Sequence, residues 1–168
     1  VLELAKIVAQ TDLPAGGLSI LPMDREAGNR LVTDERFKLL SFTGSPEVGW
    51  KMKSRAGKKK TLLEMGGNAG VIVGPSADIA HAVKRSVVGG FAYSGQVCIH
   101  AQRIYVHDDV FDQFVSAFVK EAENLKVGDP QEDATQISAM IDEKNARRVE
   151  QWIQEAREAG AKVLTGGS

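Results

Sequence analysis

The chain has 168 residues, 43% hydrophobic and 26% charged, with a formal net charge of −1. This size and composition are typical of a globular protein with a sizeable core. The small net charge excludes a strong overall attraction to nucleic acid or to a membrane surface, so we expect neither as a partner. A single cysteine excludes an internal disulfide and favours a reducing, cytoplasmic location.

The hydrophobic pattern alternates between helical and strand periods along the chain. In the first part it predicts helices at about 2–11, 24–33 and 46–55 and strands at 18–21, 38–43 and 61–65. In the second part it predicts strands at 71–73 and 103–107, and helices that follow residue 78, span about 109–124 and follow residue 142. Strands separated by helices indicate an α/β fold with a mostly parallel sheet.

Two features of the pattern concern the limits of domains and of the chain. The apolar runs 61–65 and 71–73 are separated by a glycine-rich segment at 66–70 with no helix, which favours a domain boundary there. The chain begins at Val1 directly in a helical pattern and stops after an apparent strand. We therefore expect it to be an excerpt of a longer protein.

The stretch "FTGSPEVG", 42–49, joins a strand end to a helix start. Ser45 suits the N-cap and Pro46 the first helical position, whereas Gly44 allows close approach and Gly49 close helix packing. A helix N-terminus directly after a strand can bind an anion. Taken alone, this stretch is more often an ordinary strand-to-helix turn with a good cap, and the dinucleotide motif GxGxxG is absent from it.

The stretch "LLEMGGNAG", 62–70, places Glu64 at the end of an apolar strand, before two glycines. Apolar neighbours disfavour the charged form of a carboxylate and so raise its pKa. A raised pKa is typical of a carboxylate that acts as a general base. The alternative is an exposed glutamate at a strand end.

Cys98 follows the polar, glycine-containing sequence "YSGQV", close to the end of a helix. This setting suits an accessible thiol, although a lone cysteine is often a buried, inert side chain. A nucleophilic thiolate needs a base and a site for the oxyanion, which often includes its own backbone N–H. One cysteine and three scattered histidines form no metal-ligand pattern, so we expect no metal site.

Together and in this order, these stretches resemble the NAD(P)-dependent aldehyde dehydrogenase superfamily. The resemblance rests on "SFTGSPEVG", "LLEMGGNAGVIV" and "FAYSGQVC", and it continues through "QRIYVHDDVFDQFV", "KVGDP" and "EAGAKVLTGG". It covers essentially the whole chain. Its Glu-x-Gly-Gly and Gly-Gln-x-Cys motifs are highly specific to that family.

The resemblance implies roles for individual residues. Cys98 matches the nucleophile, whose thiolate attacks an aldehyde to give a thiohemiacetal and, after hydride transfer to NAD or NADP, a thioester. Glu64 matches the general base that activates water to hydrolyse the thioester. The cofactor is expected at Gly44, Ser45, Gly49 and Gly66.

The resemblance also implies an α/β fold with parts of two doubly wound Rossmann-like domains. Residues 1–66 would form the second half of the NAD(P)-binding domain, and residues 67–168 the first half of the catalytic domain. The chain would be the central fragment of a longer protein, which is expected to be a homo-oligomer that acts on a small aldehyde. We expect the fragment alone to be inactive, because it carries only half of a cofactor site.

Two alternatives stay open on the residues themselves. The first is a non-catalytic α/β module that uses the same fold for binding or assembly, and a buried, unreactive Cys98 would favour it. The second is a cysteine-dependent hydrolase in which Cys98 pairs with His100, and a requirement for His100 would favour that alternative.

Overall fold

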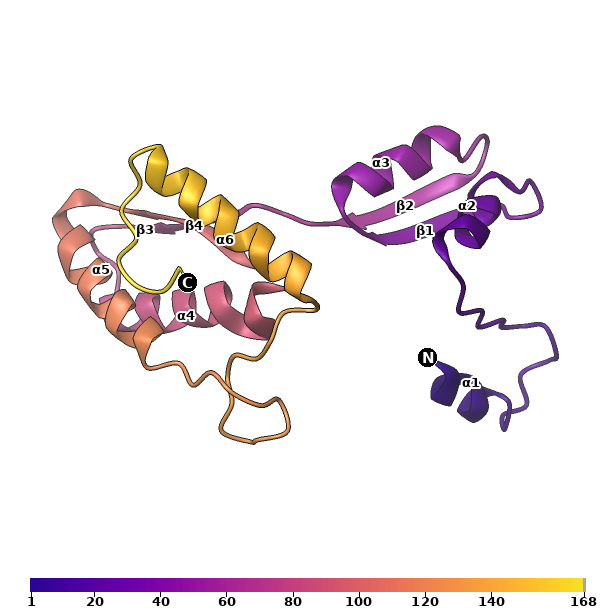
Figure 1. Ribbon diagram of the computed structural model, residues 1–168, viewed down its shortest axis with the longest axis horizontal. Helices are drawn as coiled ribbons and strands as arrows, with labels where there is room; N and C mark the ends of the chain where they lie inside the picture. Colours follow the sequence, from indigo (N-terminus) through magenta and orange to yellow (C-terminus); the bar gives the residue numbers. More distant parts are fainter. Residues whose placement is uncertain (168) are drawn as a thin grey trace. The chain divides into compact units, whose positions relative to one another are not determined.

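The computed structural model describes residues 1–167, and the chain divides into two compact units, Val1–Met65 and Gly66–Ser168 (Figure 1). The first unit contains α1 (Leu2–Val8), α2 (Arg25–Thr33), β1 (Leu39–Gly44), α3 (Pro46–Arg55) and β2 (Lys60–Met65). The second contains β3 (Ala69–Val73), α4 (Ile79–Phe91), the 3-10 turn η1 (Ala92–Gly95), β4 (Ala101–Val106), α5 (Asp108–Glu123) and α6 (Glu143–Glu158). The division falls one residue before the boundary expected from the sequence.

One expected strand, at 18–21, is absent from the structure, and the first helix ends at Val8, not near residue 11. The side chains of Leu18 and Leu21 are mostly exposed, and within residues 1–167 no strand pairs with this segment. An apolar run becomes a strand only when a neighbouring strand accepts its backbone hydrogen bonds. The prediction of a strand at 18–21 is therefore wrong for this structure.

The first unit is built on a parallel βαβ arrangement. Strand β1 pairs with β2 from Leu39 opposite Lys60 to Gly44 opposite Met65, and α3 is the crossover between them. Gly49 of α3 is buried against the sheet, where an added Cβ would lie 2.6 Å from Sδ of Met65. Helix α3 therefore packs this closely only because position 49 has no side chain.

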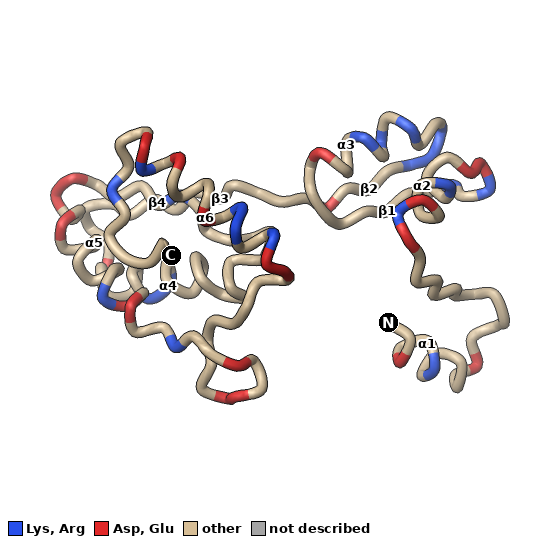
Figure 2. Tube along the Cα trace, in the orientation of Figure 1, with Lys and Arg blue, Asp and Glu red and all other residues tan. Residues whose placement is uncertain are grey.

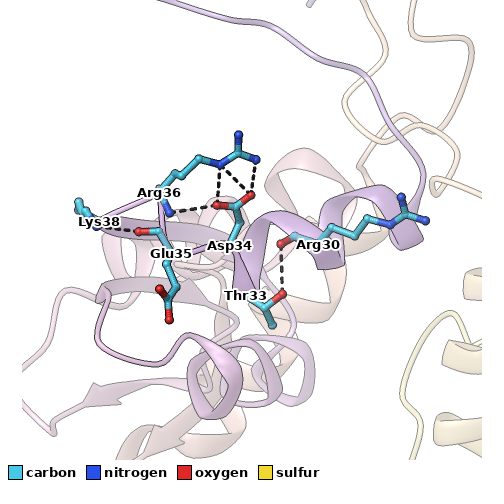
Figure 3. A network of polar contacts seen from close by, with 6 residues as sticks. All are labelled: Arg30, Thr33, Asp34, Glu35, Arg36 and Lys38. Carbon is cyan, nitrogen blue, oxygen red and sulfur yellow. Dashed lines mark hydrogen bonds and ion pairs between the residues drawn. The ribbon is translucent and has the colours of Figure 1, made fainter.

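The turn from α2 to β1 is closed by a polar network (Figure 3). The Asp34 carboxylate accepts hydrogen bonds from the backbone N–H of Arg36 at 3.0 Å and from its guanidinium at 2.6–3.2 Å. Lys38 Nζ donates to the Glu35 carbonyl at 2.7 Å. The hydrogen bond from the Arg36 side chain, followed by the one from its backbone, holds the pKa of Asp34 well below its usual range.

The second unit repeats the parallel βαβ arrangement and adds two further helices, α5 and α6. Strand β3 pairs with β4, with α4 between them in the chain, and the Asp78 carboxylate caps α4 by accepting from the His81 N–H at 3.1 Å. The core contains four buried side chains from β3, α4 and α5: Val73, Val83, Val87 and Phe114. Parallel strands with crossover helices in both units confirm the α/β class.

Charge is distributed unevenly along the chain (Figure 2). The basic residues of α3, of the turn after it and of the start of β2 follow one another closely in the chain, and most of them are exposed: Lys51, Lys53, Arg55, Lys58, Lys59 and Lys60. Positive charge at the C-terminal end of a helix is favourable, so the run has a local electrostatic reason. Over residues 1–167, no helix is both long and apolar enough to span a membrane.

Candidate active site

Cys98 lies in a tight turn at 97–100, between η1 and β4. The turn is closed by the His100 N–H, which donates to the Val97 carbonyl at 3.3 Å. The cysteine is exposed, and within residues 1–167 no hydrogen bond engages its thiol or its backbone N–H. Cys98 is therefore not the buried, inert cysteine that the sequence left open as an alternative.

The backbone just before Cys98 adopts an unusual conformation. Tyr93, Ser94 and Gly95 have φ values of 54°, 55° and 71°, which makes three successive residues left-handed. Glycine tolerates this region, but a residue with a side chain pays roughly 1–3 kcal/mol there, so other contacts must hold Tyr93 and Ser94 in place.

Those contacts come from a segment more than 40 residues further along the chain. Ser94 Oγ donates to the Ser138 carbonyl and accepts from the Ser138 N–H, both at 3.0 Å. Gln96 Oε1 accepts from the Ile141 N–H at 3.1 Å. We call this pair of attachments the 94–96 clamp, which comprises the side chains of Ser94 and Gln96 and the backbone of Ser138 and Ile141.

The contacts of the His100 ring do not suit a catalytic base for Cys98. Its Nε2 is hydrogen-bonded to the carbonyl of Gly90, in α4, and its buried Nδ1 has no partner within residues 1–167. Neither ring nitrogen is hydrogen-bonded to Cys98. The structure therefore gives no support to a Cys98–His100 dyad and instead makes His100 a link from the Cys98 turn to α4.

The glycines before β3 differ in what they contact. A Cβ added to Gly67 would lie 3.0 Å from the Cys98 carbonyl oxygen, whereas one added to Gly66 would have no neighbour within 4 Å. The close approach to the cysteine turn therefore favours glycine at 67. Sequence reasoning named Gly66 and missed Gly67, although the Gly-Gly pair was a signal for both.

In the first unit, the other candidate residues meet at one edge of the β1–β2 sheet. Gly44 ends β1, Ser45 is the N-cap of α3, and Glu64 lies opposite Thr43 in the register. Met65 contacts the α3 side of the sheet, so the alternation of a strand places Glu64 on the opposite face, where it is exposed. The carboxyl ends of both strands thus lie beside the N-terminus of α3.

This edge offers hydrogen-bond donors to an anionic group such as a phosphate. The Ser45 side chain makes no capping hydrogen bond, so its hydroxyl is available to a ligand. Pro46 occupies the first position of α3, and the N–H groups of the first turn that follow it lack partners within the helix. Gly44 leaves room for a phosphate to approach these donors, and the helix dipole favours negative charge there. Within residues 1–167 no group of three His, Cys, Asp or Glu side chains could hold a metal ion.

Comparison with known proteins shows which family the chain resembles. The model of the aldehyde dehydrogenase family matches residues 1–168. The chain is 41% identical over 167 residues to 3-sulfolactaldehyde dehydrogenase from Priestia aryabhattai, covering 99% of this chain and 35% of the relative. It is 37% identical over 169 residues to the NADP(+) succinate-semialdehyde dehydrogenase GabD of Escherichia coli, covering 99% and 35%.

Solved structures give the same result. Aldehyde dehydrogenase 21 from Physcomitrella patens, in complex with the reaction product succinate, superposes with a TM-score of 0.95 at 46% identity and covers 99% of this chain and 35% of its own. Glyceraldehyde-3-phosphate dehydrogenase GapN from Methanocaldococcus jannaschii, complexed with NADP, gives 0.95 at 37% identity, with 99% and 38% covered.

These likenesses define the fold as part of the Rossmann-like α/β architecture of such enzymes. The chain belongs to the aldehyde dehydrogenase family. It spans about a third of the length of the curated relatives it matches.

Proposed function

We propose that the chain is the central segment of an NAD(P)-dependent aldehyde dehydrogenase, which oxidises a small aldehyde to a carboxylic acid. The observation that carries this proposal is the exposed Cys98 turn in a chain that matches the family over residues 1–168. Residues 1–66 would belong to the cofactor domain and residues 67–168 to the catalytic domain.

Cys98 is the proposed nucleophile. Its thiolate attacks the carbonyl carbon of the aldehyde and forms a carbon–sulfur bond, while the carbonyl electrons move to the oxygen. The backbone N–H of Cys98 makes no hydrogen bond within residues 1–167, so it is available to donate to this oxyanion. Loss of hydride from the same carbon leaves a thioester on Cys98.

Glu64 is the proposed general base for the second half of the reaction. Its exposed carboxylate would take a proton from water as the water oxygen attacks the thioester carbon. The carbon–sulfur bond then breaks, which releases the carboxylic acid and returns Cys98 to its starting state.

Gly44 and Ser45, with the N-terminus of α3, are the proposed cradle for the pyrophosphate of the dinucleotide. Gly49 supports them from within α3 by allowing the helix to lie against the sheet. Gly66, at the start of the second unit, is proposed to lie near the nicotinamide. When it is bound, the NAD or NADP accepts the hydride.

The wider setting is also a proposal. Because the chain spans about a third of its relatives, we propose that the isolated 168 residues are inactive. We also propose that the full-length protein is a cytoplasmic homo-oligomer. NADH formation by the isolated chain, lost in Cys98→Ala, would contradict the proposed inactivity.

The decisive experiment uses the full-length protein that carries this segment. Absorbance at 340 nm is followed with NAD or NADP and with 3-sulfolactaldehyde, succinate semialdehyde and benzaldehyde, for wild type and Cys98→Ala. We expect reduced cofactor from wild type and none from Cys98→Ala. If neither protein reduces the cofactor although both bind it, the dehydrogenase proposal fails and a non-catalytic module takes its place.

A second variant separates the base from the nucleophile. Glu64→Gln should still form the thioester, so we expect a burst of about one NAD(P)H per site followed by slow turnover. Glu150→Gln, an exposed change in α6 with no assigned role, is the matched control. Steady turnover at the wild-type rate in Glu64→Gln would remove this residue from the mechanism.

A further inference from the structure

We infer that Ser94 and Gln96 are positioning residues for Cys98, which act by holding the left-handed turn at 93–95 against the backbone of Ser138 and Ile141. The inference rests on the proposed function, because it concerns the nucleophile of that reaction. Neither side chain is assigned contact with substrate or cofactor.

The Cys98 side chain has no hydrogen bond of its own to orient it. It is exposed and its thiol is not hydrogen-bonded within residues 1–167. The position of Sγ therefore depends on the backbone of residues 97–100 and on whatever fixes that backbone. A nucleophile displaced by about 1 Å can lose roughly 100-fold in rate.

The backbone that leads to Cys98 would not keep its conformation without contacts from outside the turn. Tyr93 and Ser94 are left-handed although both have side chains, and Gly95 continues the same conformation. Without external contacts, residues of this kind relax to negative φ, and the following residues would move with them.

The 94–96 clamp supplies those contacts from outside the turn. The Ser94 hydroxyl both donates to and accepts from the backbone of Ser138, so its only donor and one of its two acceptor lone pairs bind a single residue. Gln96 adds a bond to Ile141. On the other side of Cys98, His100 is bonded to Gly90, so the cysteine lies between two fixed points.

The test compares variants in the full-length protein by three readouts: the rate constant for alkylation of Cys98 by iodoacetamide, kcat for aldehyde oxidation, and the Kd of the cofactor. Ser94→Ala removes both bonds and keeps the unfavourable φ, so we expect alkylation and kcat to fall about tenfold with an unchanged cofactor Kd. Ser94→Gly removes the bonds and also the strain, so it should lose less. Gln96→Met keeps the size but not the acceptor, and it should resemble Ser94→Ala.

Ser138→Ala is the matched control, because Ser138 takes part only through its backbone. We expect it to match wild type in all three readouts. Alkylation and kcat within twofold of wild type in Ser94→Ala would overturn the inference, and so would equal losses in Ser94→Ala and Ser94→Gly.

Hydrogen exchange provides a measurement that needs no variant. The amides of Ser138 and Ile141 should exchange slowly in the wild-type protein, and exchange as fast as in an unstructured peptide would overturn the inference. Alkylation and exchange report on the clamp whether or not an aldehyde is oxidised. A wild type that binds cofactor but oxidises no aldehyde therefore refutes the proposed function and leaves the clamp to be judged on these readouts.

Discussion

The two units share a parallel βαβ arrangement but differ in how much they bury. In the first unit the buried apolar side chains are Val32 and Ala56, from α2 and from the end of α3, and the sheet face opposite α3 exposes Leu39 and Leu62. The second unit adds α5 to α4 and encloses a contiguous core. The first unit also has a second helix, α2, which contributes one buried side chain, Val32, whereas α4 and α5 of the second unit enclose a continuous core with the sheet.

The difference places the two halves of the proposed chemistry in unequal surroundings. Cys98 is in the unit with the larger core, whereas Ser45 and Glu64 lie in the unit with few buried side chains. Each unit has one tryptophan, Trp50 in α3 and Trp152 in α6, so fluorescence in Trp→Phe backgrounds gives each unit a probe of its own. The following changes test the comparison.

The largest effect is expected for Phe114→Ala. Phe114 is 2% exposed and its ring stacks on Phe118 at 5.6 Å, so truncation should destabilise the second unit by about 3–5 kcal/mol. Urea unfolding followed by Trp152 measures it. Phe111→Ala, in the same helix but 48% exposed, is the control and should cost much less. Equal losses in the two variants would contradict a core centred on Phe114.

Gly49→Val should affect the first unit instead. Its side chain would meet Met65 and Phe42, and we expect a loss of about 1–3 kcal/mol of stability from overpacking. Unfolding followed by Trp50 measures this loss, and Met65→Ala in the same chain should restore part of it. If Gly49→Val is neutral, α3 does not depend on close contact with the sheet.

The two aspartate caps provide a matched pair across the units. Asp24 accepts from the Ala27 N–H at 2.8 Å and Asp78 from the His81 N–H at 3.1 Å. Replacing either by alanine should cost about 1 kcal/mol. Because the caps are local, we expect the Trp50 transition to shift only in Asp24→Ala and the Trp152 transition only in Asp78→Ala. A shift of both transitions by one variant would show that the units unfold together.

The smallest effect concerns pH. The pKa of Asp34 is lowered in the folded state by Arg36, so the ion pair contributes stability above the unfolded pKa of about 3.9 and loses it as the pH falls toward the folded value. We expect the stability of the first unit to decline less below pH 4 in Asp34→Asn than in wild type. Asp12→Asn, at another exposed position of the same unit, should leave the acid dependence as it is in wild type.

Local signals were sufficient to predict most of the fold. The helices after Asp24, Asp78 and Asp142 begin where an aspartate precedes an amphipathic run, and each aspartate accepts a backbone N–H in the structure. Capping depends on three or four neighbouring residues, so a sequence shows it directly. The strand expected at 18–21 failed for the opposite reason, because strand formation depends on a distant partner.

The same distinction applies to the candidate site. The position of Cys98 after a helix followed from the glycine and polar residues around it. The attachment of Ser94 to Ser138 could not be predicted, because a hydroxyl 44 positions from its partner leaves no periodic trace. The preference for glycine at 67 likewise arises from the carbonyl oxygen of Cys98, which is distant in the sequence.

The 94–96 clamp also has a consequence for the order of folding. Closing a segment of more than 40 residues loses more chain entropy than forming a local helix does. Contacts between residues so far apart in the sequence therefore form late. Helix α4 precedes Ser94 in the sequence, and α5 lies between the two clamped segments. Both helices can pack before the clamp closes. We therefore expect the Cys98 turn to form last in its unit, after the core has assembled, so that the final position of the thiol is reached only in chains that have completed the fold.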